Sequence, residues 1–132
     1  MSEQGAESST IHLLLDAQGD VTDQFEICLK HIFAKYCTPA VDRSAGGLLT
    51  PPEGAYLSDE GLREWALATN GEPFSEDTKS DVVEFFDVTD DGNLTFKGFL
   101  QVYQLQTENE EKETWKDLEA HGFNRTLTLV KS

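Results

Sequence analysis

Two short segments of the chain repeat one pattern at the start of two predicted helices. Residues 57–62 read LSDEGL and residues 94–99 read LTFKGF, so leucine, a hydroxyl residue, two variable residues, glycine and a large apolar residue recur in the same order. Each segment follows a predicted helix and a loop. A helix–loop–helix unit of this kind cannot bury its apolar face alone, so the repetition predicts two units packed together. Leu57 and Leu94 are then expected to lie in a short two-stranded antiparallel bridge.

Apolar residues recur at helical spacing in several stretches, which predicts an all-α domain around the two units. Ser58 has the character of an N-cap, and Asn70 followed by Gly71 indicates a helix end. The segment TENE at 107–110 has the form of a capping box, which predicts that a further helix begins there. The segment TIHLLL at 10–15 fits a strand and a packed segment equally well. The expected helices are 22–36, 58–70, 75–86, 96–106 and a mostly charged helix after residue 107.

The length and composition suit one domain: the chain has 132 residues, of which 38% are hydrophobic. Residues 1–10 have no periodic apolar pattern and are expected to form a disordered tail. Residues 11–107 are expected to form the pair of units. Residues 108–132 are expected to form a C-terminal helix and tail packed on that pair.

The second loop carries the residue types of a calcium loop. The EF-hand signature, D-x-[DN]-x-[DN]-G-x5-E, places side-chain oxygens at alternate positions before a glycine. Asp87, Thr89 and Asp91 occupy its first, third and fifth positions, and a glycine follows. Calcium takes six to eight hard oxygen ligands, and alternate residues of such a loop point inward. Asp87, Thr89, Asp91 and Asn93, the last through its backbone carbonyl, are therefore the candidate metal ligands.

The twelfth position of this loop holds Gly98 where the signature has a bidentate glutamate. Two oxygens are lost, so the expected affinity for Ca²⁺ is weak, with a dissociation constant of about 10⁻⁴ to 10⁻³ M. Two interpretations stay open: weak calcium binding, or a loop kept for its turn, because Asp, Asn and Gly are favoured in tight turns anyway. If the loop keeps the calcium-binding curve, Gly98→Glu is expected to raise the affinity at least tenfold, about 1.4 kcal/mol, and if the loop has another shape the affinity is expected not to change.

The first loop departs further from the signature. Twenty residue steps separate Cys37 from Leu57 where seven separate Asp87 from Leu94, so this loop is thirteen residues longer, and it is rich in proline and glycine. Its twelfth position is again a glycine, Gly61. We expect it to bind no metal.

Charge constrains the partners. The chain has 25 acidic and 10 basic residues, for a formal net charge of −15, which argues against binding nucleic acid, where phosphates must be neutralised. Cations and a basic or amphipathic helix of another protein are the expected partners. The N-terminus has no signal-peptide pattern and no apolar run is long enough to span a membrane, so a cytoplasmic protein is expected. Cys28 and Cys37 lie roughly 13 Å apart at the helical rise, too far for a disulfide.

No catalytic constellation is present, so we expect no enzyme. The spacing Cys28-x-x-His31 resembles half a metal site, but it has no second pair and Cys28 lies on an apolar helix face, so packing is favoured. His12 and His121 have no evident partner. The aromatic residues are expected mainly in the core, with some free to line a groove between the units: Trp65, Phe85, Phe86, Phe99, Tyr103 and Trp115.

Three segments together resemble the first EF-hand pair of the Miro mitochondrial GTPases: YLSDEGLREW at 56–65, LTFKGFL at 94–100 and ETWKDLEAHGFNRTLTL at 113–129. The resemblance implies two EF-hands, the second of them a ligand-free "hidden" hand. This chain departs from the family because its second loop keeps more ligand residues than its first. It also lacks a glycine-rich phosphate loop, so GTP hydrolysis is not implied.

Two functions follow as expectations. The first is an EF-hand protein that binds calcium weakly at the second loop and acts as a regulatory or protein-interaction module. The alternative is a metal-free, EF-hand-like structural adaptor whose C-terminal segment fills the groove from within.

Overall fold

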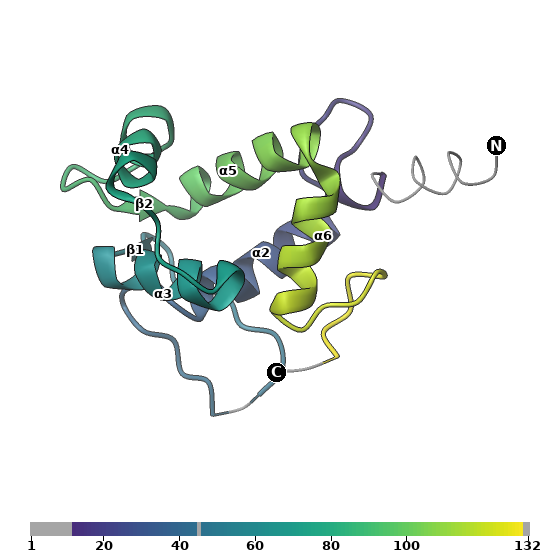
Figure 1. Ribbon diagram of the computed structural model, residues 1–132. Coiled ribbons are helices and arrows are strands. Elements are labelled where there is room, and N and C mark those ends of the chain that lie inside the picture. Colours follow the sequence, from purple (N-terminus) through teal and green to yellow (C-terminus); the bar gives the residue numbers. More distant parts are fainter. Residues whose placement is uncertain (1–11, 45, 131–132) are drawn as a thin grey trace.

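The computed structural model describes residues 12–44 and 46–130 and is mostly helical with one small sheet (Figure 1). The predicted disordered tail, 1–10, lies outside these residues. Of the segment 10–15, residues 12–14 are helical and Leu15 is in a β-bridge. The elements that follow are α2 (Asp23–Ala34), β1 (Tyr56–Leu57), α3 (Asp59–Asn70), α4 (Glu76–Phe85), β2 (Leu94–Thr95), α5 (Phe96–Asn109) and α6 (Glu111–Ala120).

The predicted bridge between the two units is confirmed. β1 and β2 pair antiparallel, with Leu57 opposite Leu94 and Tyr56 opposite Thr95. Both leucines are buried. The sheet therefore joins the end of the long loop 38–56 to the end of the second loop, directly before α3 and α5 begin.

Hydroxyl side chains cap four of the helices, and the predicted cap at Ser58 is confirmed. In each case the side-chain oxygen accepts the backbone N–H three residues on, which satisfies a donor that the helix itself cannot. The caps are Thr22 for α2, Ser58 for α3, Ser75 for α4 and Thr95 for α5.

The core is an aromatic cluster between α2, α3 and α5. Phe99 of α5 is fully buried, and its ring centroid lies 5.3 Å from Phe33, 4.9 Å from Trp65 and 5.2 Å from Tyr103. Cys28 is buried beside this cluster, and Cys28 and Cys37 are both free, as predicted.

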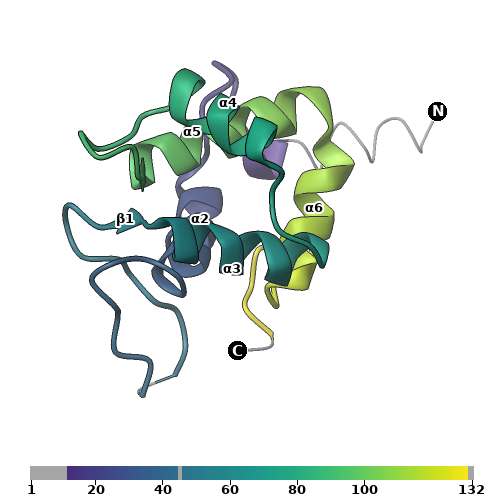
Figure 2. The same ribbon diagram turned by 60° about the vertical axis from the view of Figure 1, so that its left-hand side comes forward.

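The predicted start of the last helix is wrong. α5 continues to Asn109, and the predicted boundary at residues 107 and 108 falls inside it. Thr107 is buried, and its hydroxyl is 2.8 Å from the hydroxyl of Thr114 in α6. Thr107 lies inside α5 and so does not cap a helix. Its hydroxyl instead forms a hydrogen bond between α5 and α6. α6 then turns back to pack on α5 and α3 (Figure 2), with Trp115 and Leu118 buried.

The predicted apolar face of α4 is also only partly correct. Val82 is buried and Phe86 is half-buried, but Val83 is 47% and Phe85 68% exposed. α4 packs through one narrow stripe, so its other apolar side chains remain on the surface.

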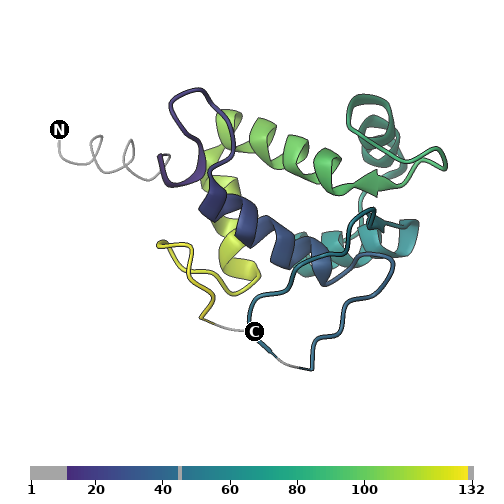
Figure 3. The same ribbon diagram turned by 180° about the vertical axis from the view of Figure 1, so that it is seen from behind.

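Two buried histidines tie distant segments to the helices. His31 of α2 accepts the Leu49 N–H at Nδ1 (3.0 Å) and so holds the long loop, which otherwise extends away from the helices (Figure 3). His121, at the end of α6, lies 2.9 Å from the Lys35 ammonium at Nδ1 and 2.7 Å from the Thr69 hydroxyl at Nε2. An ammonium group can only donate, so Nδ1 is the acceptor and Nε2–H donates to Thr69. The expectation that His121 has no partner is therefore wrong.

These histidines predict a loss of stability in mild acid. Burial, then the charges of Lys35 and Arg43, lowers the pKa of His31 from 6.5 to about 4, and burial, then Lys35, lowers the pKa of His121 to about 3. The unfolded chain takes up these protons near pH 6.5 and the folded chain does not. The free energy of unfolding is therefore fully retained above pH 6.5 and falls as the pH drops below it, by at most about 1.4 kcal/mol per pH unit for each histidine.

Urea unfolding measured at intervals from pH 7 to pH 5 checks this expectation. His121→Gln should reduce the pH dependence by roughly half, since one of two such histidines is removed. His12→Gln, at an exposed position, is the control and should leave it unchanged. The same pH dependence of stability in wild type and His121→Gln would show that His121 does not have a lowered pKa in the folded protein.

Candidate functional site: the second loop and the pocket beside α4

The carboxylate of Asp87, the first predicted metal ligand, is bonded to the loop itself. Its Oδ2 accepts a short hydrogen bond from the hydroxyl of Thr95, the residue that caps α5. The backbone N–H of Asp87 donates to Gln101 Oε1 (2.9 Å), and its carbonyl accepts the Thr95 N–H (3.2 Å). Asp87 therefore ties the end of α4 to the start of α5 without any added ion.

The other three predicted ligands are arranged as a turn. The Thr89 hydroxyl accepts the Asn93 N–H (3.1 Å), and the Thr89 N–H donates to the Asn93 carbonyl (2.8 Å). Gly92, at φ 85°, lets the backbone reverse between them. Asp91 is exposed. The structure thus joins Thr89 to Asn93 and Asp87 to Thr95, and among the described residues no hydrogen bond joins Asp91 to the other three.

The described residues contain no group of three or more His, Cys, Asp and Glu side chains placed to hold a metal. The predicted site has only two carboxylates, so this finding does not test it. Calcium binding at Asp87, Thr89, Asp91 and Asn93 stays a prediction.

The turn of the second loop occurs at two other places that the sequence reading missed. In each copy the side-chain oxygen of the first residue, i, accepts the backbone N–H of residue i+4. The backbone N–H of residue i donates to the carbonyl of residue i+4, and residue i+3 has a positive φ. In each copy a β-bridge also closes the base of the turn. The three turns are 16–22, 89–95 and 124–130.

The third copy shows what the turn requires. Residues 124–130 read NRTLTLV and contain no carboxylate, yet Thr128 N–H donates to Asn124 Oδ1 (3.0 Å) just as Asn93 N–H donates to Thr89. Leu127, at φ 61°, stands where the other two copies have glycine. The pattern D/T-x-x-G fits the first two copies, but it also fits Thr95–Gly98 at the start of α5, and leucine in the glycine position hides the third copy. The curve of the loop therefore forms without acidic ligands.

Gly98 closes the second loop by close contact with backbone. A Cβ atom at this position would lie well within 3.0 Å of both the Asp87 carbonyl oxygen and the Leu94 side chain, closer than such atoms approach. Gly61 stands at the equivalent position of α3, and a Cβ there would overlap the carbonyl oxygen of Tyr36 in the same way. In both units, a glycine in the first turn of the second helix lies against a backbone carbonyl just after the end of the first helix. The space into which a glutamate side chain would start is filled by main chain, so Gly98→Glu is no longer expected to complete a calcium site.

A pocket of about 250 Å³ lies between α3, α4, α5 and α6. Its apolar lining includes two of the aromatic residues expected in a groove: the apolar side chains are Trp65, Phe74, Val82, Phe86 and Val102. Three carboxylates from α4 and α6 also line it, and no Lys or Arg is among the described lining residues: Asp81, Glu113 and Asp117. We call this the Asp117 pocket. A larger, more open pocket of about 590 Å³ shares Phe74 with it and is lined by both acidic and basic residues.

Asp117 is the functional candidate that the sequence reading did not identify. It is 6% exposed, and its Oδ2 accepts hydrogen bonds from the Tyr103 hydroxyl (3.0 Å) and Gln106 Nε2 (3.2 Å). Burial raises the pKa of this carboxyl group. Nothing in the charged pattern of residues 110–120 distinguishes Asp117 from its exposed acidic neighbours, because only the packing of α6 shows which carboxylate is buried.

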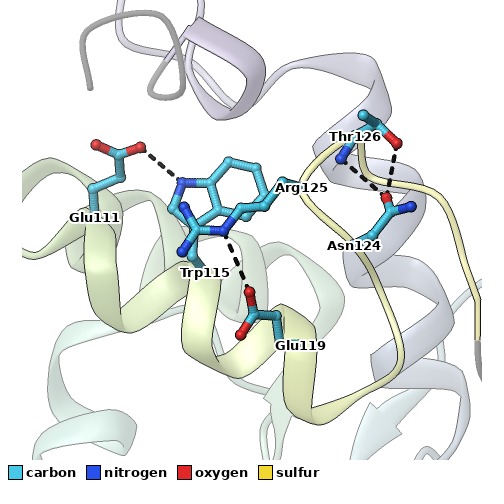
Figure 4. A network of polar contacts seen from close by, with 6 residues as sticks. All are labelled: Glu111, Trp115, Glu119, Asn124, Arg125 and Thr126. Atoms are coloured by element: carbon cyan, nitrogen blue, oxygen red, sulfur yellow. Dashed lines mark hydrogen bonds and ion pairs between the residues drawn. The ribbon is translucent and has the colours of Figure 1, made fainter. Parts of the chain in front are cut away.

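The C-terminal turn is fastened to α6 by a polar network (Figure 4). Arg125 lies over the Trp115 ring, with its guanidinium carbon 5.0 Å from the ring centroid, and its Nε is 3.3 Å from Glu119 Oε2. Trp115 Nε1 donates to Glu111 Oε2 (2.8 Å). These contacts fix the helix that carries Asp117.

Comparison of the chain with protein-family models, with curated proteins and with solved structures gave no match.

The glycine contact predicts that Gly98→Ala destabilises the fold. At an open helical position this change stabilises a protein by up to about 1 kcal/mol. Here the added methyl group meets the Asp87 carbonyl, so we expect a net loss of about 1 to 3 kcal/mol in the free energy of unfolding, as in other overpacked sites. Urea unfolding measures it.

Lys97→Ala, on the exposed neighbouring residue of the same helical turn, is the control and should change stability by less than about 0.5 kcal/mol. A Gly98→Ala variant more stable than wild type would show that the contact is absent.

Proposed function

We propose that this chain is a metal-independent, EF-hand-like module that acts by binding another protein. The observation that carries the proposal is the close contact of a glycine with a backbone carbonyl at the start of the second helix in both helix–loop–helix units. Gly61 and Gly98 sit against backbone carbonyls where a calcium loop would need its closing glutamate. The occurrence of the same turn at 124–130, without a carboxylate, supports a loop kept for its shape.

The chemistry of the surface supports a basic amphipathic helix as the partner. The chain has a net charge of −15, and the Asp117 pocket combines apolar walls with three carboxylates. Helices that enter a groove present apolar anchors at i, i+3, i+4 and i+7 and are selected further by charge. α6 already covers part of α3 and α5 from within, as the adaptor interpretation requires, and leaves the pocket beside α4 open.

The proposed setting is the cytoplasm. Two free, buried cysteines are compatible with a reducing compartment. Within residues 12–44 and 46–130 no helix combines the length and apolar character needed to cross a bilayer.

A calcium titration followed by amide NMR separates this proposal from weak calcium binding. We expect no saturable shift of the Gly92 amide at calcium concentrations up to about 1 mM, the upper edge of the weak class. A saturable shift that is lost in Asp91→Asn but kept in Asp90→Asn would contradict us and establish the weak site. Both positions are exposed, so neither change should disturb the fold.

Partner binding should be independent of metal. As a probe we choose an amidated helical peptide of leucine and arginine with leucine at i, i+3, i+4 and i+7. Its dissociation constant, measured by fluorescence anisotropy, should agree within about twofold, or 0.4 kcal/mol, in EDTA and in calcium. Binding that appears only with calcium would overturn the proposal.

A further inference from the structure

Asp117 is a buried carboxylate without a salt bridge in the described part of the chain, and the charge of the adjacent Lys116 is the smallest of the influences on its pKa. Its side chain lies in the wall of the pocket and is 6% exposed. The two groups that donate to it, Tyr103 and Gln106, are neutral. Burying a charge is costly unless it is paired, and two neutral donors offset only part of that cost. The carboxylate is therefore electrostatically incomplete in the free protein.

A simpler interpretation is that Asp117 serves only to accept the hydrogen bond of the buried Tyr103 hydroxyl. An asparagine could accept the same hydrogen bonds without burying a charge, so that role does not require a carboxylate. Glu113 lies one helical turn before Asp117 on the same pocket wall, and Asp81 faces it from α4. Asp81 and Glu113 are exposed and Asp117 is buried, so the three carboxylates together make the mouth and wall of the pocket negative.

The walls of the pocket suit a long side chain with a charged end. At about 250 Å³ the pocket is smaller than the usual site for a drug-sized ligand. Trp65, Phe74 and Phe86 offer aromatic surface, along which the methylene groups of a basic side chain can lie while its charge contacts a ring face.

The rim of the pocket provides a place for the rest of a partner. Thr78, Asp81 and Phe85 follow one another at i, i+3 and i+7 along one stripe of α4. The first two line the pocket, and Phe85 is 68% exposed. A helix that places a basic side chain in the pocket would find an apolar contact beside it.

We propose that the Asp117 pocket is an anchoring site for an arginine side chain of a partner helix, with its guanidinium group on the Asp117 carboxylate. This inference rests on the proposed function, since it names the anchor of the basic helix. Arginine fits better than lysine because its planar guanidinium pairs with a carboxylate through two donors, stacks on aromatic rings and is more weakly hydrated.

The first test uses a side-chain mimic. Propylguanidinium chloride is titrated into the whole protein at 150 mM salt, which screens general attraction to the acidic surface, and the Trp65 indole N–H resonance is followed. We expect a saturable shift with propylguanidinium and none with the neutral analogue propylurea. A Trp65 resonance that does not respond to propylguanidinium, or responds equally to propylurea, would overturn the inference.

Variants localise the effect. Asp117→Asn keeps the shape and the acceptor for Tyr103, so it should weaken binding of propylguanidinium at least tenfold without lowering stability. Asp23→Asn, an exposed change in the first turn of α2, should leave binding unchanged. If Asp117→Asn does not fold, Val102→Phe, which places a larger side chain in the pocket with Asp117 intact, should abolish binding. Equal affinity in wild type and either pocket variant would overturn the inference.

The leucine–arginine peptide distinguishes this inference from the proposed function. If the peptide binds wild type and Asp117→Asn equally, the module binds basic helices but not through this pocket, and the inference fails alone. If propylguanidinium occupies the pocket in an Asp117-dependent way and the peptide does not bind, the pocket stands and the proposed function fails. Peptide binding that weakens at least tenfold in Asp117→Asn supports both.

Discussion

The contact between a glycine of the exiting helix and a backbone carbonyl of the incoming segment sets the geometry of this protein. Gly61 meets the Tyr36 carbonyl and Gly98 meets the Asp87 carbonyl, and no other residue fits at that distance. Each contact brings the start of one helix against the end of another, which places Leu57 and Leu94 for pairing in the small sheet. The aromatic core lies between α2, α3 and α5, the helices that begin or end near these two contacts.

The proposed function assigns to these contacts the role that an ion has in a calcium loop. In a calcium loop the metal gathers oxygens from both ends of the loop and thereby holds the two helices together. Here the Asp87 carboxylate bonds to the Thr95 hydroxyl, and Thr89 and Asn93 form a turn that recurs at 124–130 without acidic residues. These hydrogen bonds link groups near the two ends of the loop. Outside the loop, three carboxylates lie around one pocket: Asp81, Glu113 and Asp117.

Much of the fold could be predicted from the sequence, because hydroxyl caps and helical periodicity are local signals. The helices after Ser58 and Thr95 and the pairing of Leu57 with Leu94 are examples. The failures come from tertiary packing: Thr107 resembles a cap but joins two helices, and periodicity does not show that Phe85 remains exposed. The candidate site was less predictable still. In the sequence, Gly98 looks like the loss of a metal ligand, and only the structure shows the Asp87 carbonyl against it. Asp117 differs from its acidic neighbours only in being buried.

Amide hydrogen exchange in the second loop tests the central claim that protein contacts hold it closed. Asn93 and Gly98 donate their N–H groups to the Thr89 and Thr95 hydroxyls, so both amides report on the closed loop. The account predicts that both exchange slowly in EDTA and that calcium does not change their rates. Rapid exchange in EDTA that becomes slow when calcium is added would contradict it, because the ion would then be what closes the loop.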